Sequence, residues 1–214
     1  LRALCDKYGI IWIADEVMAG FGRTGEWFAF QNWGAQPDLI TFAKGSNSGY
    51  VPVGGVIISG EIAATFNDRV FPGGLTYSGH PLAAASIVAS FDAMKEEGIV
   101  ENAKHIGETI LGPGLRELQA KHKVVGEARG LGVFWALDLV VDRATKEPIA
   151  PYGGTSQAMA DLGAAMKKRG ALPFMNFNRL HVVPPCTISE AEAKEGLEIV
   201  DGALGDIAHY YTGA

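Results

Sequence analysis

The chain has 214 residues, of which 48% are hydrophobic and 20% charged, so it can bury a sizeable core in one or two domains. A formal net charge of −6 and a pI near 5.4 argue against nucleic acid or an acidic membrane as partner. No run is apolar enough to span a bilayer, and residues 1–9 lack the pattern of a secretion signal.

The first half of the chain has the pattern of an α/β sheet. Residues 1–8 are typical of the last turns of a helix closed by Gly9. The chain starts without a methionine, and we therefore expect an N-terminal portion to be missing. Apolar runs then predict buried strands of a mainly parallel sheet, at 10–14, 39–42 and 54–59.

Helical patterns dominate after residue 80. Residues 81–97 predict a helix that ends at Gly98, and 99–122 continue as helix with an interruption near Gly112-Pro-Gly114. A strand at 133–141, a helix at 155–169 and a last helix with a capping box at Ser189 and Glu192 follow. We therefore expect a domain boundary near residue 98, with a small α+β domain over residues 99–214.

Lys44 follows the strand at 39–42 and precedes a glycine. An amine among apolar residues can lose its proton and attack an aldehyde, which makes Lys44 a candidate for Schiff-base formation. A single lysine is more often a solvated surface charge, so Lys44 needs support from neighbouring motifs.

Two further segments supply that support. Asp15 opens the run Asp-Glu-Val-Met-Ala-Gly-Phe-Gly-Arg-Thr-Gly, and Lys44 follows it by 44 − 15 = 29 residues. A third segment, Leu-Thr-Tyr-Ser-Gly-His-Pro, begins at residue 75. In these ordered segments the chain resembles the class III (subgroup II) pyridoxal-phosphate-dependent aminotransferases, and it is similar to the ω-amino acid and amine:pyruvate aminotransferases among them. The resemblance implies a fold-type I pyridoxal-phosphate-dependent transferase of the α/β class.

This resemblance also implies that the chain is the C-terminal half of such an enzyme. Residues 1–98 would then be the C-terminal portion of the large cofactor-binding domain, including the interdomain helix. Residues 99–214 would be the small C-terminal domain. Much of the substrate pocket would lie upstream of this chain.

The same resemblance implies roles for residues that would hold pyridoxal phosphate. Asp15 would keep the ring nitrogen of the cofactor protonated, as a buried carboxylate can; alternatively, it only caps the following turn. Val17 would pack on one face of the ring, which is close to ordinary core packing. Lys44 would hold the cofactor as a Schiff base and, once displaced by a substrate amine, would move protons.

Thr76 implies a second subunit. In the resembling family a threonine at this place contacts the phosphate of the cofactor bound by the neighbouring chain, which implies a homodimer with a shared active site. A hydroxyl and backbone amides can satisfy phosphate oxygens without adding charge. The alternative is that Thr76 and Tyr77 form only a turn into the helix at Pro81.

The residues that would determine substrate specificity depart from the family pattern. Family members that act on amino acids often hold a carboxylate with an arginine three residues before a Pro-Pro pair. Here His181 stands at that distance from Pro184, and Arg179 lies two residues earlier. If 178–183 is extended, both side chains point to one face, and Arg179 can bind an anion. The alternative, a surface arginine and a packed histidine, is equally open.

The sequence therefore predicts a cytoplasmic aminotransferase that moves an amino group from an ω-amino acid or amine to a 2-oxo acid such as pyruvate. A racemase, decarboxylase or lyase of the same family remains an alternative, because these motifs govern the cofactor rather than the fate of the substrate. A non-catalytic α/β ligand-binding domain is a second, more distant alternative. Cys5 and Cys186 are far apart and are expected to be free thiols, and no metal site is expected.

Overall fold

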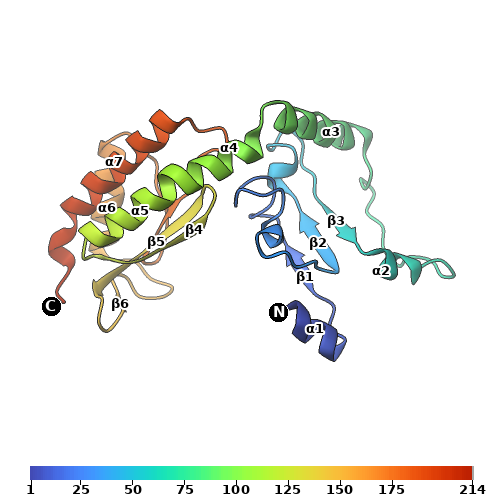
Figure 1. The fold of residues 1–214 in the computed structure, drawn as a ribbon, viewed down its shortest axis with the longest axis horizontal. Coiled ribbons are helices and arrows are strands. Elements are labelled where there is room, and N and C mark those ends of the chain that lie inside the picture. The colour runs from blue at the N-terminus through green and yellow to red at the C-terminus, as the bar shows by residue number, and fades with distance from the viewer. Residues whose placement is uncertain (214) are drawn as a thin grey trace. The chain divides into compact units, whose positions relative to one another are not determined.

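The computed structural model describes residues 1–213 and shows two compact units (Figure 1). The N-terminal unit ends at Glu101 and the C-terminal unit begins at Asn102. The predicted combination of α and β structure is confirmed. Every helix within residues 1–213 is too short or too polar to traverse a bilayer.

The N-terminal unit contains a three-stranded sheet in the order β1-β2-β3. Its strands are β1 (Ile13–Asp15), β2 (Leu39–Phe42) and β3 (Gly55–Ile58). The pair β1/β2 is parallel, as predicted, whereas β2/β3 is antiparallel. The connection from β2 to β3 holds only a 3₁₀ turn, η2 (Lys44–Ser46), and lacks the crossover helix that a parallel return requires.

The helical elements of the same unit are mostly short. They are α1 (Arg2–Tyr8), the 3₁₀ helix η1 (Ala29–Trp33), α2 (Gly60–Ala64) and α3 (Pro81–Glu96). Gly9 and Gly98 follow α1 and α3 with φ of 63° and 61°, the left-handed conformation that glycine adopts without steric cost. The predicted helix at 81–97 and its end at Gly98 are confirmed.

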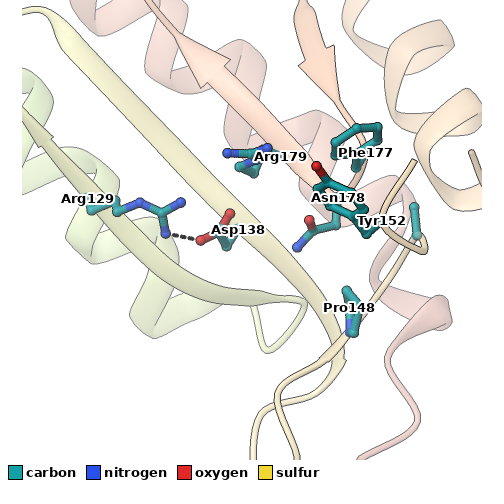
Figure 2. A pocket seen from close by; sticks show the side chains of 8 residues that line it. Arg129, Asp138, Pro148, Tyr152, Phe177, Asn178 and Arg179 are labelled. Carbon is teal, nitrogen blue, oxygen red and sulfur yellow. Dashed lines mark hydrogen bonds and ion pairs between the residues drawn. The ribbon is translucent and has the colours of Figure 1, made fainter. Parts of the chain in front are cut away.

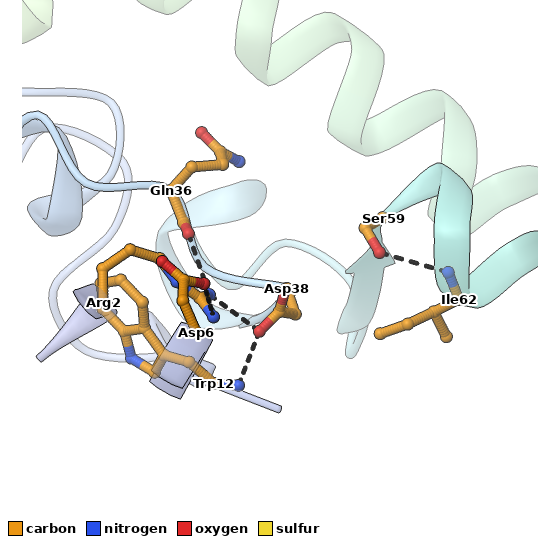
Figure 3. A network of polar contacts seen from close by, with 7 residues as sticks. All are labelled: Arg2, Asp6, Trp12, Gln36, Asp38, Ser59 and Ile62. Atoms are coloured by element: carbon orange, nitrogen blue, oxygen red, sulfur yellow. Dashed lines mark hydrogen bonds and ion pairs between the residues drawn. The ribbon is translucent and has the colours of Figure 1, made fainter. Parts of the chain in front are cut away.

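A polar network joins α1 to the starts of two strands (Figure 3). The Oδ2 atom of Asp38 accepts hydrogen bonds from Arg2 Nη1 at 2.8 Å and from Trp12 N at 2.7 Å. The hydrogen bond from Arg2, followed by that from the Trp12 amide, lowers the pKa of the Asp38 carboxyl group. These contacts fix where β1 starts beside β2, and in the resulting register Asp15 lies opposite Thr41.

The C-terminal unit is an antiparallel sheet with helices on one face (Figure 1). Its sheet order is β4-β5-β8-β7, and β6 pairs with β5. The strands are β4 (Val125–Leu131), β5 (Phe134–Asp142), β6 (Glu147–Pro148), β7 (Phe174–Asn176) and β8 (Arg179–Val182). The helical elements are α4 (Ile99–Ile106), which begins before the boundary, the π-helical turn η3 (Gly107–Leu111), α5 (Gly112–Lys121), α6 (Gln157–Lys168), α7 (Glu190–Asp206) and the 3₁₀ turn η4 (Ala208–Tyr210).

The two faces of this sheet differ in chemistry. Leu137, Leu139 and Leu180 are fully buried in the core formed with the helices. Strand alternation places Asp138 and Arg179 on the opposite face, where both remain partly exposed. The open face of the sheet is therefore the polar one.

The predicted interruption of the helix at 99–122 lies one turn earlier than expected. The irregular turn is η3, and Pro113 lies in the first turn of α5, where proline is tolerated. Within η3, Gly107 passes so close to Gly132 that a Cβ on Gly107 would lie 2.2 Å from Gly132 O. The same carbonyl accepts a hydrogen bond of 2.8 Å from Trp135 Nε1.

Candidate active site

Asp15 ends β1 and its side chain is exposed. Its Oδ1 atom accepts hydrogen bonds from Thr41 Oγ1 at 3.1 Å and from Val17 N at 3.2 Å. Thr41 comes from the neighbouring strand β2, so the register of the sheet orients the carboxylate. The hydrogen bond from Val17 N is the local turn contact that the capping alternative requires. Both hydrogen bonds use Oδ1, so Oδ2 has no hydrogen-bond partner within residues 1–213.

The next residue, Glu16, points the other way and is 4% exposed. Its carboxylate accepts hydrogen bonds from Ala29 N at 2.9 Å and Phe30 N at 3.0 Å, the first free amides of η1. The Asp-Glu pair thus divides into an exposed carboxylate at the sheet edge and a buried carboxylate that holds the following loop. Sequence reasoning assigned no role to Glu16.

The glycine-rich segment after Glu16 packs against the loop that contains Lys44. Phe21 has a φ of 59°, donates its backbone N–H to Trp27 O at 2.6 Å, and is 4% exposed. Its ring centroid lies 5.4, 6.0 and 5.5 Å from those of Phe28, Phe42 and Phe91. A Cβ on Gly45 would lie 3.0 Å from Phe21 Cβ, so this aromatic cluster directly supports the residue after Lys44.

Lys44 begins η2 with a φ of 42° and is exposed. This left-handed conformation is uncommon for a residue with a side chain. Because β1 and β2 are parallel, Asp15 at the end of β1 and Lys44 just after β2 share the carboxyl edge of the sheet. No direct hydrogen bond or ion pair joins the two side chains in the described part of the chain.

Thr76 and Tyr77 lie in an exposed turn before α3. Ser78 N donates to Leu75 O at 3.0 Å, and His80 N donates to Tyr77 O at 3.3 Å. Within residues 1–213 no hydrogen bond joins Thr76 to Asp15 or Lys44. The structure therefore brings Asp15 and Lys44 to one edge but leaves Thr76 in an exposed segment.

Arg179 lines a cleft on the open face of the C-terminal sheet (Figure 2). On β5, directly opposite Arg179 in the strand register, Asp138 forms an ion pair with Arg129, and Arg129 also contacts Glu127 Oε2 at 3.1 Å. Arg179 forms no ion pair within residues 1–213, and its guanidinium carbon lies 6.0 Å from the Phe177 ring centroid. The other lining residues are Pro148, Ala150, Tyr152 and Asn178.

His181 follows Arg179 at the next position of the same strand face. Its Nε2 atom is buried and has no hydrogen-bond partner among the described residues, while its ring lies 4.9 Å from that of Phe174. Burial, and then the positive charges of Arg179 and Arg129, lower the pKa of His181. The histidine is therefore neutral near pH 7 and leaves Arg179 as the charged group on this part of the strand.

Comparison with known proteins decides the family. The family model described as "Aminotransferase class-III" matches residues 1–204. The chain belongs to the class III aminotransferases.

Several class III aminotransferases are similar to this chain. A crystal structure of taurine:2-oxoglutarate aminotransferase from Bifidobacterium kashiwanohense, in complex with PLP and glutamate, has a TM-score of 0.92 and 43% identity, covering 99% of this chain and 47% of that one. The 5-aminovalerate aminotransferase DavT of Pseudomonas aeruginosa is 38% identical over 97% of this chain and 47% of its own length. The putrescine–pyruvate aminotransferase of the same bacterium is 46% identical over 72% of this chain and 34% of its own length.

This class III aminotransferase chain spans about half the length of the curated relatives that it matches over nearly its whole extent. The resemblance read from the sequence motifs is confirmed, as is the fold class, because solved transaminases match the chain at 34% identity with a TM-score of 0.89.

Proposed function

We propose that this chain is part of a pyridoxal-phosphate-dependent aminotransferase that moves an amino group from an ω-amino acid or amine to a 2-oxo acid such as pyruvate. Family membership supports the reaction type. The observation that carries the proposal is the position of Asp15 and Lys44 at the same edge of two adjacent parallel strands. The names of the 5-aminovalerate and putrescine–pyruvate relatives favour the substrate class.

The residues at this edge fit the cofactor. Lys44 offers an exposed amine, and Asp15 keeps one carboxylate oxygen free of protein partners within residues 1–213. When bound, pyridoxal phosphate supplies an electron sink for the substrate carbon. Asp15 would hold a proton on the ring nitrogen by its negative charge, with Thr41 orienting the carboxylate and Val17 packing on one face of the ring.

Lys44 would have two roles in this reaction. Its Nζ atom would hold the cofactor covalently as a Schiff base between turnovers, and the freed amine would then carry a proton to and from the substrate carbon. The reaction would follow a ping-pong route, because one amine leaves its nitrogen on the enzyme before the 2-oxo acid takes it up.

We extend the proposal to a cytoplasmic homodimer with a shared active site. In this arrangement Thr76 would serve the cofactor phosphate of the partner subunit. Its exposure supports the role, since an exposed hydroxyl is free to bind an incoming group. Residues 1–98 would then be the C-terminal portion of the large cofactor-binding domain, and residues 99–214 the small domain.

Arg179 and His181 would bind the acidic end of the substrate. An arginine in a cleft that forms no ion pair among the described residues suits a carboxylate or sulfonate, and a neutral histidine beside it adds no competing charge. An unreactive alkyl sulfonate bound at Arg179 would add negative charge near His181 and so raise its imidazole pKa. Titration of the His181 NMR signals with and without the sulfonate tests this, and an unchanged pKa in spite of saturating binding contradicts it.

Absorption spectroscopy with lysine mapping tests the main proposal. We expect pyridoxal phosphate to give a visible band with the protein, borohydride to fix the cofactor on Lys44, and Lys44→Ala to abolish both. Lys95→Ala removes an exposed lysine of α3 and serves as the control. An ω-amino acid should bleach the band and pyruvate should restore it.

Two results would overturn this function. A band on Lys44 that no amine bleaches reversibly, or turnover without a 2-oxo acid, points to the racemase, decarboxylase or lyase alternative. Absence of any lysine adduct points to a non-catalytic ligand-binding domain.

A further inference from the structure

We propose that Ser86 of α3 is a positioning residue for Lys44 and that it acts through Asn47. The two side chains form a clamp, defined here as Asn47 and Ser86, that locks the η2 turn in its unusual conformation. The consequence for catalysis rests on the proposed function of Lys44. The clamp itself is a property of this fold.

Asn47 is the first part of the clamp and is 2% exposed. Its backbone N–H donates to Lys44 O at 3.4 Å, which closes the η2 turn. Its side-chain Nδ2 donates to Val51 O at 2.7 Å and to Ser86 Oγ at 2.9 Å, and its Oδ1 accepts from Gly49 N at 3.1 Å. Both amide hydrogens and the oxygen are therefore used, and the asparagine cannot turn without breaking buried bonds.

Ser86 is the second part and ties the loop to a helix. Its Oγ donates to Ala83 O at 2.7 Å within α3 and accepts from Asn47, 39 residues away in the chain. Because the hydroxyl hydrogen is committed to Ala83, a lone pair of Ser86 is directed to receive the asparagine. Further along α3, Met94 is buried with Phe21 in the core of the same unit, so the helix gives the loop a fixed support.

The conformation of the loop explains why a clamp is needed. Lys44 and Ser48 have φ of 42° and 54°, values that residues with side chains rarely adopt unless the surrounding contacts hold them. The Phe21 side chain supports Gly45 on one side. Loss of the Ser86 bond would leave one buried Asn47 hydrogen unpaired and let Lys44 relax toward ordinary backbone angles, which moves its amine away from the edge shared with Asp15.

The test compares Ser86→Ala with Ser90→Ala. Ser90 lies one turn later in α3 and has no side-chain hydrogen bond within residues 1–213, so the control makes the same chemical change in the same helix. Hydrogen exchange of the amides at 45–51 measures the clamp without cofactor. Borohydride trapping at graded pyridoxal phosphate concentrations measures how readily Lys44 couples, and thermal unfolding reports general stability.

We expect Ser86→Ala to speed exchange at 45–51 and to weaken coupling at Lys44 by about three- to tenfold, the range of one hydrogen bond, while Ser90→Ala matches the wild type. Ser86→Thr keeps the hydroxyl and should restore coupling. Equal exchange and coupling in Ser86→Ala and Ser90→Ala overturn the clamp, even if Ser86→Ala melts earlier. A wild-type protein that does not couple at all refutes the proposed function of Lys44 and with it the positioning role, while exchange still decides whether the clamp exists.

Discussion

Gly107 offers the sharpest test of the packing in the C-terminal unit. A Cβ on Gly107 would lie 2.2 Å from Gly132 O and 2.4 Å from both Gly132 C and Gly132 Cα. All three are backbone atoms, so no flexible side chain can move aside. Gly107→Ala must therefore displace either η3 or the turn before β5.

The magnitude follows from three contributions. Overpacking of a tight core costs about 1–3 kcal/mol. Displacement of Gly132 also weakens its hydrogen bond from Trp135, which is worth about 0.5–1.5 kcal/mol. The higher helix propensity of alanine offsets this loss of stability by about 1 kcal/mol. We expect Gly107→Ala to lower the free energy of unfolding by about 0.5–3.5 kcal/mol.

Gly196→Ala is the matched control. Gly196 lies within α7 and, apart from its chain neighbours and the backbone of its own helix, no atom comes within 4 Å of its ideal Cβ position, so alanine should stabilise the unit by about 0.5–1 kcal/mol. Urea unfolding followed through the NMR signal of the Trp135 indole N–H reports on this unit specifically. The packing described for Gly107 is wrong if Gly107→Ala unfolds at the same urea concentration as the wild type or at a higher one. It is also wrong if the Trp135 signal does not shift in Gly107→Ala.

Two further predictions concern the carboxylates of Asp15 and Asp201. Thr41→Val removes the hydroxyl that donates to Asp15 and should weaken pyridoxal phosphate binding about three- to tenfold in a spectroscopic titration, whereas Thr41→Ser should not. The hydrogen bond from Lys121, followed by that from His122, lowers the pKa of Asp201, so this carboxylate stabilises the fold above its unfolded pKa and loses that effect as pH falls through its folded value. Asp201→Asn should therefore destabilise at pH 7 but not at pH values below the folded pKa, as measured by urea unfolding at several pH values; an exposed α7 control, Glu195→Gln, should show no such difference.

The sequence predicted the helices that begin or end at a recognisable capping residue. Ser189 and Glu192 form the predicted capping box of α7, and Gly98 ends the helix that begins at Pro81. The motif around Asp15 likewise predicted the family, because the order of its residues is specific.

The sequence did not predict β4, and the reason is tertiary packing. This strand contains Gly126 and Gly130, which local propensity disfavours in strands. A Cβ at these positions would lie 2.8 Å from Val140 Cγ1 and 2.6 Å from Trp135 Cγ, so neighbouring side chains of β5 occupy the space. The same limit applies to the cleft at Arg179, because its lining comes from strands and loops far apart in the chain.

The clamp on the lysine loop has a consequence for protein engineering. A designer who grafts a reactive lysine onto another scaffold usually copies the lysine and its immediate neighbours. Here such a graft of Lys44 would omit Ser86, which stands 86 − 44 = 42 residues away and holds the loop through Asn47. A portable unit therefore needs the loop, the Phe21 side chain that supports Gly45 and the first turns of α3, and a graft without them should yield an ordinary surface lysine.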